Sequence, residues 1–524
     1  MPPTYKFFEQ EIEKFVSAIL PPTYFPQKVR ANKVIRDAIW GFNLCYKHEI
    51  NIIDSPLVQR LRNLFQTSLT LFTYPSAVHS RFEHSLGVVS VAHKMLTSIN
   101  EKLKQKNKNI EQHQWAEVRL AALLHDCGHT PFSHGSEEYY KINPIFDLLS
   151  TENKKLFGTA APHEILSYFI VRSMSFQSYW GKICKLYDDG SAYCDLTKIS
   201  LERVALFILG KNLDGEDTLK YLAQVINGPF DADKLDYLSR DGYFTGLQLQ
   251  IDIERLLLAL NVWPEENTLC IDVSGVAALE QVLFSKMQIF HSVYHHHKVR
   301  AALSSLHKLF DMILDNPQTM GIDISDSLRK DSNGRKYPNP FAFLYLDDYD
   351  IFSRCNVNCQ RGVEQNNCLK INNHISSIKN RELLKRALVL SIGTIIADAD
   401  SNAAFASFRD PSNRATVEQV RKLIANDSGV EICDIVIDIP GEPRFEKISR
   451  DAQVKLTDTK IVPLEDAFPT RGWVTGYITY KYNVYLLAPA SVCPKVAQSA
   501  IKIFKNYCGI NLKPDAVEQA KHGV

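Results

Sequence analysis

Histidine is concentrated in one stretch of this 524-residue chain. Sixteen histidines are present, and eight of them lie between residues 79 and 163, where an even spread would place fewer than three. Histidine is the commonest transition-metal ligand and the side chain best suited to proton transfer near neutral pH. The stretch therefore predicts a metal site or a proton-transfer site, and it constrains the fold to bring these residues together.

Two segments of this stretch place histidines on predicted helices. In HSRFEHS, Ser80 and Glu83 have capping-box spacing, so a helix is predicted to begin near Ser80 with His84 in its first turns. In LLHDCGHTPFSH, an apolar helix ends on the adjacent pair His125 and Asp126, where glycine and proline stop it. Polar ligands at the buried end of an apolar helix are costly unless they hold a metal or a hydrogen-bond network.

A third segment, DADKLDYLSRD, completes the pattern. Asp231 is predicted to cap a helix on which Asp233, Tyr237 and Asp241 follow one another along one face. One histidine, an adjacent His-Asp pair and a distant aspartate form a nitrogen and oxygen ligand set that suits Fe, Mn, Zn, Ni or Mg. A lone histidine such as His84 is more often structural, but the three segments together favour a divalent metal site.

The hydrophobic pattern predicts a mainly α fold with a smaller α+β tail. Apolar residues recur at three- and four-residue spacing through most of residues 35–310. The helices predicted there are 57–66, 80–99, 115–126, 163–173, 219–226, 233–241 and 276–314. Residues 430–439 and 473–487 are β-branched and aromatic, which predicts strands, and residues 492–507 are predicted to close the chain with an amphipathic helix.

The segment from residue 323 to 373 differs from its surroundings. It is rich in Asp, Asn, Ser and Arg and contains two closely spaced prolines, which predicts an irregular or mobile insertion. Cys355, Cys359 and Cys368 lie within it, with His374 just beyond. Their spacing is not that of a standard zinc finger, so a structural zinc site is only an alternative to free thiols there.

Composition narrows the class of protein. Lys and Arg number 60 and Asp and Glu 59, so the net charge of +1 offers no global basic excess for gripping nucleic acid. The N-terminus does not resemble a signal peptide, and the most apolar run, residues 387–397, is too short to cross a membrane and is predicted to be a buried helix. Eleven scattered cysteines fit free thiols, so we expect a cytoplasmic protein without membrane contact.

Five stretches carry a resemblance to a known family. They are IIDSPLVQRLR, HSRFEHSLGV, LLHDCGHTPFSH, DADKLDYLSRD and YHHHKVR. Their H…HD…D pattern resembles HD-domain phosphohydrolases, and the fuller sequence is similar to deoxynucleoside triphosphate (dNTP) triphosphohydrolases, which include dGTPase-like bacterial enzymes and the vertebrate SAM and HD domain-containing enzyme. No SAM domain is recognised in this sequence.

Together with the hydrophobic pattern, the resemblance implies a domain order. An N-terminal extension (1–33) would precede an HD-domain helical body (34–315), followed by the irregular insertion (316–380) and a C-terminal α+β lobe (381–524).

The resemblance also implies roles for individual residues. The metal would be bound by His84, His125, Asp126 and Asp233. It would polarise the α-phosphate of a dNTP and lower the pKa of a bound water, giving deoxynucleoside and inorganic triphosphate. The catalytic group implied is His134, His129, His163 and Asp233. In it, His134 would protonate the departing 5′-oxygen.

Substrate contacts are implied for a further group. Its members are Gln66, Arg81, Lys234, Tyr237, Asp241, His295 and Lys298. Arg81 and Lys234 would contact phosphate, and Tyr237 would stack under C2′ and so select deoxyribose, although simple core packing explains this tyrosine equally well. At the position of a phosphate-binding arginine of the vertebrate enzyme, this chain has Met287 with Lys286 beside it.

A regulatory site is a further implication. Asp54, Gln59 and Arg62 match the guanine-reading residues of the vertebrate enzyme, so GTP or a dNTP is a candidate activator. A helix start with Ser55 or Asp54 as N-cap and Pro56 at the first helical position explains the same segment structurally. Relatives assemble through the helical body and the C-terminal lobe, so we expect a homo-oligomer: a dimer, tetramer or hexamer.

Two other functions stay open from the sequence. A different HD phosphohydrolase, such as a nucleotidase or a cyclic-nucleotide phosphodiesterase, would not need Lys234, Tyr237 and Asp241. A nucleotide sensor or single-strand nucleic-acid binder with little turnover would not need the complete set of metal ligands.

Overall fold

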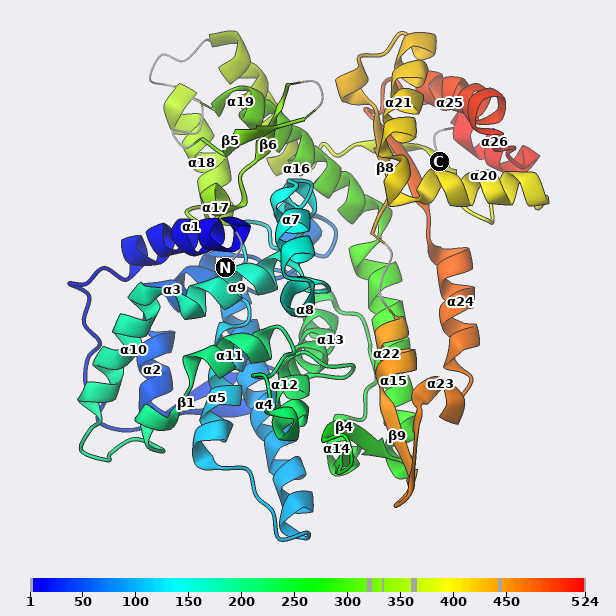
Figure 1. The fold of residues 1–524 in the computed structure, drawn as a ribbon. Coiled ribbons are helices and arrows are strands. Elements are labelled where there is room, and N and C mark those ends of the chain that lie inside the picture. The colour runs from blue at the N-terminus through cyan, green and yellow to red at the C-terminus, as the bar shows by residue number, and fades with distance from the viewer. Residues whose placement is uncertain (1–2, 318–322, 332–333, 360–364, 442–444, 523–524) are drawn as a thin grey trace. The chain divides into compact units, whose positions relative to one another are not determined.

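The chain forms two compact units, each built from segments that are distant in the sequence. The first unit comprises residues 1–286, 313–365 and 446–468, and the second comprises residues 287–312, 366–445 and 469–524. The computed structural model describes residues 3–317, 323–331, 334–359, 365–441 and 445–522 (Figure 1). Among them, no helix combines the length and the apolar character needed to span a membrane.

The first unit is mostly helical. Its helices are α1 (Pro3–Ile19), α2 (Lys47–Ile53), α3 (Pro56–Gln59), α4 (Arg81–Lys104), α5 (Gln112–Leu124), α6 (His134–Tyr140), α7 (Ile145–Glu152), α8 (Lys154–Phe157), α9 (Pro162–Arg172), α10 (Met174–Leu186), α11 (Leu201–Ile208), α12 (Lys220–Ile226), α13 (Ala232–Thr245), α14 (Ile253–Leu258), most of α15 (Val276–Ile289), α17 (Pro340–Phe343), α18 (Asp348–Cys359), α22 (Glu446–Asp451) and α23 (Leu464–Ala467). The mainly α class predicted from the sequence is confirmed, and α4, α5, α9, α12 and α13 realise predicted helices.

Helix α4 is central to the first unit and lies against both α5 and α13. It begins where the capping box predicts, since the backbone N–H of Ser80 donates to Oε2 of Glu83 at 2.5 Å. Its buried face includes Val88, Val91 and Met95, which are fully buried. The predicted helix over residues 57–66 is wrong beyond α3 and the short 3-10 turn Arg60–Asn63, because the chain then extends to form a bridge between Phe65 and Ser80.

Two β structures complete the first unit's core. A hairpin joins β1 (Lys33–Asp37) to β2 (Gly41–Cys45), and a four-stranded sheet has the order β10-β9-β4-β3. The strands of that sheet are β3 (Leu260–Trp263), β4 (Thr268–Asp272), β9 (Gln453–Thr457) and β10 (Lys460–Pro463). Parallel pairing of β4 with β9 sets Cys270 opposite Gln453 and so brings residues 446–468 back into this unit.

The second unit contains a three-stranded antiparallel sheet with helices. The strand order is β7-β11-β8, from β7 (Lys385–Leu390), β11 (Val484–Ala488) and β8 (Val436–Asp438). The helices are most of α16 (His297–Asp315), α19 (Gln365–Lys379), α20 (Ala399–Arg409), α21 (Arg414–Ser428), α24 (Thr470–Lys481), α25 (Cys493–Cys508) and α26 (Pro514–His522). α25 realises the helix predicted over residues 492–507, while the predicted helix 276–314 is broken between α15 and α16 by a π-helical turn at Phe290–Tyr294.

The prediction of an irregular insertion is wrong for the described residues of that segment. They form a hairpin of β5 (Ser325–Lys330) and β6 (Lys336–Pro338), then α17, α18 and the start of α19. Despite its polar composition the segment contributes to the core, because Phe341, Phe343 and Ile351 are buried. The ring of Phe341 lies 5.0 Å from that of Phe8 in α1.

The expectation that the cysteines are free thiols is confirmed for most of those described, but not for all. Eight described cysteines are free thiols, as the sequence suggested. Cys368 is instead disulfide-bonded, which removes its thiolate from the alternative zinc site. The side chains of Cys355 and Cys359 lie outside the described residues. Nε2 of His374 donates to the carbonyl oxygen of Ser305 at 2.8 Å.

Three secondary-structure predictions in the tail need correction. Residues 473–487 are not one strand: α24 occupies most of the segment and only β11 is extended. Thr470 and Val474 are buried one helical turn apart, so tertiary packing overrides the β propensity of the aromatic residues. The strand predicted over residues 430–439 shrinks to β8, and the buried helix predicted over residues 387–397 is largely β7.

Gly87 permits the close approach of α4 and α13. A Cβ atom at this position would overlap the carboxylate of Asp236 and the guanidinium of Arg240, both on α13. Because Gly87 lies one turn after His84, this contact also sets how close α13 comes to that histidine. Glycine at this position therefore links helix packing to the predicted metal site.

We expect Gly87→Ala to lower the free energy of unfolding by about 2 kcal/mol, because the added methyl group overpacks the α4–α13 contact. Urea unfolding of both variants would measure this. Gly181→Ala is the matched control: Gly181 lies inside α10 with nothing near its Cβ position, so alanine should leave stability unchanged or raise it by up to about 1 kcal/mol. Equal stability of the Gly87 variant and the native chain would contradict the packing argument.

Candidate functional site

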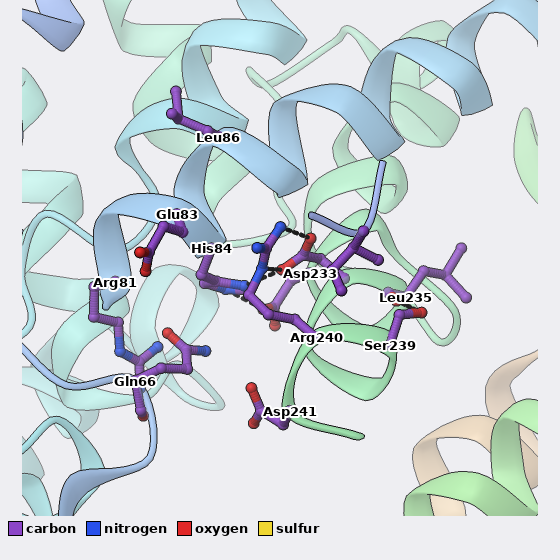
Figure 2. Close-up of polar contacts among 12 residues, drawn as sticks. Gln66, Arg81, Glu83, His84, Leu86, Asp233, Leu235, Ser239, Arg240 and Asp241 are labelled. Atoms are coloured by element: carbon purple, nitrogen blue, oxygen red, sulfur yellow. Dashed lines mark hydrogen bonds and ion pairs between the residues drawn. The ribbon is translucent and has the colours of Figure 1, made fainter. Parts of the chain in front are cut away.

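The ends of three helices bring four predicted ligands together. Nε2 of His84, on α4, lies 3.0 Å from Oδ1 of Asp233 on α13 and 3.6 Å from Oδ2 of Asp126. Nε2 of His125, the C-cap of α5, lies 3.3 Å from Oδ1 of Asp126 and 3.8 Å from Oδ1 of Asp233. His84 and Asp233 face one another in Figure 2. Two imidazole nitrogens and two carboxylates thus converge; His84, His125 and Asp126 are buried, and the side chain of Asp233 is 34% exposed.

The second nitrogen of each histidine is held by the protein. Nδ1 of His84 lies 2.7 Å from Oδ2 of Asp236, and Nδ1 of His125 lies 2.8 Å from the carbonyl oxygen of Ala122. Both acceptors favour a proton on Nδ1, which leaves the lone pair on Nε2 directed at the two ligand carboxylates. This is the arrangement found around protein metal ions, so the residues fit a divalent cation.

The charges of the site reinforce this conclusion. Burial lowers the pKa of His84, but the carboxylates of Asp233 and Asp236 raise it to about 10. Burial raises the pKa of Asp233, yet His125 and His84 hold it well below its usual value. A cation and a proton therefore compete for the same imidazole nitrogens, and metal binding must release protons.

Asp236 is a functional residue that sequence reasoning missed. Besides His84, its carboxylate accepts hydrogen bonds from Trp40 Nε1 at 2.5 Å and from Arg240 Nε at 2.8 Å. Arg240, visible beside His84 in Figure 2, also pairs with Asp37 at 2.9 Å. The sequence signal was its place three residues after Asp233, on the adjoining face of the same helix.

A second cluster lies next to the ligands and contains the three predicted catalytic histidines. Oε2 of Glu137 lies 2.8 Å from Nδ1 of His163 and 3.4 Å from Nδ1 of His134. The rings of His129 and His163 stack at 4.1 Å, and Nε2 of His129 lies 3.3 Å from Oδ1 of Asp126. The side chain of His134 is 61% exposed, so within this cluster it is the residue best placed to meet a ligand.

Glu137 sets the charge of this second cluster. Burial lowers the pKa of His163, but the carboxylate of Glu137 raises it to about 9. The pKa of Glu137 itself would rise on burial and is instead held well below its usual value, first by His163. The four side chains also satisfy the distances of a cation site. Glu137 carries no sequence signal beyond its spacing three residues after His134.

Arg81 is buried against the metal ligands. Its Nη1 donates to Oδ2 of Asp126 at 2.8 Å, its Nε to Ser133 Oγ at 2.9 Å and its Nη2 to the carbonyl oxygen of Gln66 at 3.2 Å. Figure 2 shows Arg81 and Gln66 together below His84. Arg81 therefore orients Asp126 and the neighbouring loops. The phosphate contact predicted for it remains a prediction.

The other substrate residues of the first unit lie along α13. Nζ of Lys234 pairs with Oδ2 of Asp231 at 2.5 Å, and the same Asp231 caps the helix as the sequence predicts. Oδ1 of Asp241 lies 2.8 Å from Nε2 of His79. Tyr237 is partly buried between the turns that carry Asp233 and Asp241. Burial, followed by the charge of Asp233, raises the pKa of Tyr237 well above its usual value.

Asp348 is a second residue that sequence reasoning missed. It lies in the segment predicted to be irregular, is buried, and accepts hydrogen bonds from the backbone N–H of Phe132 at 2.5 Å and of Phe65 at 2.7 Å. One carboxylate therefore joins the loop that precedes His134 to the loop that precedes Gln66. Burial raises the pKa of Asp348 to about 7. No local pattern reveals such a role, because its partners lie more than 200 residues earlier.

The substrate contacts predicted for His295 and Lys298 remain predictions, and both residues belong to the second unit. Lys298 is there one of a group of basic residues. We call this group the cationic cluster: His296, His297, Lys298, Arg381, Lys385 and Arg386. Burial, and then Lys385, lower the pKa of Lys298. Burial, and then Arg386, lower the pKa of His297 to about 4. The carbonyl oxygen of His295 accepts from the hydroxyl of Tyr485 at 3.3 Å.

The predicted regulatory residues lie at the α2–α3 corner. Nε of Arg62 donates to Oε1 of Gln59 at 2.8 Å, and the Arg62 guanidinium lies 3.6 Å from the ring centroid of Phe82. Gln59 donates to the carbonyl oxygen of Ile53 at 2.8 Å. Asp54 is exposed and pairs with Lys33 at 3.3 Å. Ser55 is the N-cap of α3 with proline in its first turn, as the structural interpretation predicts.

We expect Asp236→Asn to weaken metal binding by about ten- to a hundredfold, because the amide keeps the shape of the carboxylate but loses the charge that orients His84. Metal content after dialysis against a graded chelator would measure it. Asp252→Asn is the control, since Asp252 is an exposed N-cap of α14. Equal metal retention in both variants would show that Asp236 is not part of the metal site.

We expect Asp348→Asn to lower the free energy of unfolding by about 2 kcal/mol, because an amide has one acceptor oxygen for two buried N–H groups. Hydrogen exchange at Phe65 or Phe132 should speed up at the same time. Asp350→Asn is the control, because Asp350 is partly exposed and its carboxylate contacts near neighbours in sequence, Arg354 at 2.8 Å and the backbone N–H of Asp347 at 3.1 Å. Unchanged exchange at both amides would refute the bridging role.

Two families match the chain. Residues 81–239 match the family described as HD domain, and residues 251–331 and 335–505 match the family described as HD associated region. A deoxynucleoside triphosphate triphosphohydrolase SAMHD1 homolog of Dictyostelium discoideum is 27% identical over 71% of this chain and 64% of its own length. An uncharacterized protein of Methanocaldococcus jannaschii is 30% identical over 57% of this chain and 53% of its own length.

The chain thus spans less than two thirds of the length of these relatives. Among solved structures, a phosphohydrolase from Bacteroides thetaiotaomicron has a similar fold, with a TM-score of 0.59 and 20% identity over 87% of this chain and 100% of its own. The HD match covers the helices that carry His84, His125, Asp126 and Asp233. The chain therefore belongs to the HD-domain phosphohydrolases, with an HD associated region following its HD domain.

Proposed function

We propose that this protein hydrolyses deoxynucleoside triphosphates to deoxynucleoside and inorganic triphosphate. The observation that carries the proposal is the convergence of the Nε2 atoms of His84 and His125 on the carboxylates of Asp126 and Asp233. The relatives named as deoxynucleoside triphosphate triphosphohydrolases support the choice of substrate. A divalent cation bound there, Fe, Mn, Zn, Ni or Mg, would supply Lewis-acid catalysis and a water of lowered pKa.

The chain's own residues would supply the proton for the leaving group. As the oxygen of water bonds to the α-phosphorus, the bond from that phosphorus to the 5′-oxygen breaks, and His134 gives the 5′-oxygen a proton. Nδ1 of His134 faces Glu137 at 3.4 Å, which leaves its Nε2 for the substrate. Glu137 and His163 orient this imidazole, while Arg81 and Asp236 orient the residues that bind the metal.

The sugar would lie along α13. Tyr237 is partly buried, and an aromatic ring under C2′ would leave no room for a 2′-hydroxyl. The 3′-hydroxyl of the sugar would contact Asp241 and Gln66. His79 holds the carboxylate of Asp241, and Gln66 is buried. Buried polar groups of this kind reject an analogue that leaves them unpaired.

Activation by a nucleotide such as GTP or a dNTP forms part of the proposal. Asp54, Gln59 and Arg62 are the residues proposed to read guanine. Homo-oligomer formation and a cytoplasmic location stay predictions from the sequence.

The product decides between this function and its alternatives. Purified protein supplied with Mn²⁺ and each of the four dNTPs, with and without GTP, should release deoxynucleoside and inorganic triphosphate in equal amounts. Chromatography of the nucleoside together with ³¹P spectra of the phosphate would measure both. Asp233→Asn should abolish release, and the Asp252→Asn control should retain it.

Other results of this assay would indicate a different function. Monophosphate with pyrophosphate, or hydrolysis of nucleoside monophosphates or cyclic nucleotides alone, would replace the proposal with another HD phosphohydrolase activity. Tight nucleotide or single-strand nucleic-acid binding by the metal-loaded protein without any product would favour a sensor.

A further inference from the structure

The turn of the β1–β2 hairpin is fixed by its own sequence. Asp37 ends β1 and Gly41 begins β2, so the three residues from Ala38 to Trp40 form the turn. Oδ1 of Asp37 accepts hydrogen bonds from the backbone N–H of Ile39 at 2.8 Å and of Trp40 at 2.9 Å. Gly41 has a φ angle of 79°, the left-handed conformation that closes such a turn. The direction in which the turn presents Trp40 is therefore set locally.

Trp40 contacts both helix α13 and helix α4. Its Nε1 donates to Oδ1 of Asp236, on α13, at 2.5 Å, and Nζ of Lys94, on α4, lies 5.1 Å from the centroid of its ring. Strand β2 is also attached to α4, because Nδ2 of Asn43 donates to the carbonyl oxygen of Leu86 at 3.3 Å. The hairpin therefore joins the two helices that carry His84 and Asp233.

The carboxylate of Asp236 has its acceptor directions in use, about four for such a group. Oδ1 accepts from Trp40 and from Nη2 of Arg240 at 2.9 Å. Oδ2 accepts from Nε of Arg240 at 2.8 Å and lies 2.7 Å from Nδ1 of His84. Contacts on both oxygens oppose rotation of the carboxylate, so the oxygen that faces His84 stays in place. Of these contacts, the one from Trp40 comes from outside α4 and α13.

The same turn also holds Arg240. Oδ2 of Asp37 pairs with Nη2 of Arg240 at 2.9 Å. The side chains of Asp37, Arg240 and Asp236 are 6%, 1% and 0% exposed. Breaking an ion pair buried to this extent is costly, because the remaining charge is left unpaired. The turn thus contacts Asp236 directly through Trp40 and indirectly through Arg240.

We propose that Trp40 is a positioning residue of the metal site: its indole N–H holds Asp236 so that the carboxylate fixes the orientation of His84. The inference rests on the metal site of the proposed function, and it is independent of which phosphate substrate is cleaved. It assigns a role in the site to a segment that lies before the HD match, which begins at residue 81.

Metal affinity tests the proposal in the full-length protein. Trp40→Phe keeps an aromatic ring and removes the N–H donor, so it should weaken Mn²⁺ binding about tenfold, as measured by competition with a chelator. Asp236→Asn should weaken binding at least as much. Adding Trp40→Phe to Asp236→Asn should then cause little further loss, because the two residues act through one contact.

Trp115→Phe is the matched control. It also removes an indole N–H, which donates to Nδ1 of His93 at 3.1 Å and so joins α5 to α4 away from the ligands. This variant should bind Mn²⁺ as the native protein does. The visible absorption bands of bound Co²⁺, which report ligand geometry, should shift in Trp40→Phe and not in Trp115→Phe. A merely structural role for Trp40 would leave these bands unchanged.

The contact itself can be measured without metal. The chain has five tryptophans, and the indole N–H signal of Trp40, assigned through bonds in the native protein, should move when Asp236 is changed to Asn. The indole signal of Trp115 should stay in place. If Trp40→Phe fails to fold, as judged by its thermal transition, this measurement decides, and an unmoved Trp40 signal would overturn the proposal.

Two further results would overturn it: equal Mn²⁺ affinity of the native and Trp40→Phe proteins, and independent, additive losses in the double variant. The proposed function fails separately. If dNTPs are cleaved but Mn²⁺ affinity ignores Trp40, only the positioning role is wrong. If Mn²⁺ affinity depends on Trp40 but no dNTP is cleaved, the positioning role stands and the reaction belongs to another substrate.

Discussion

The buried convergence of two imidazoles and two carboxylates is the interaction on which the rest of the first unit depends. His84, His125, Asp126 and Asp233 come from three helices, and removing such groups from water is costly unless their charges are matched. Asp236 fixes the proton of His84, and Gly87 gives α13 the room to approach. A cation completes the arrangement, because the imidazole nitrogens that face the carboxylates are otherwise suited only to extra protons.

Holding the reactive residues in place requires parts of the chain that are far from them in sequence. Phe132 and Ser133, just before His134, have φ angles of 59° and 52°, in the left-handed region that non-glycine residues disfavour. The hydrogen bonds that Asp348 accepts from Phe132, and Arg81 donates to Ser133, stabilise this strained turn. The exposed imidazole of His134 is therefore positioned by a loop whose conformation the local sequence does not favour.

This explains how much could be predicted from sequence. Local signals were sufficient for α4 and α13, where a capping box and an aspartate N-cap mark the starts. They were also sufficient to predict that His84, His125, Asp126 and Asp233 lie close together, while metal binding by these residues stays a prediction. Residues whose role arises from distant packing carried no such signal, as Asp348 shows. The strand predicted over residues 473–487 is wrong for the opposite reason. Their β propensity is real, but Thr470 and Val474 are buried one helical turn apart, and this packing favours helix α24. The polar composition of residues 323–373 likewise predicted an irregular segment, although Phe341 and Phe343 are buried in its helix α17.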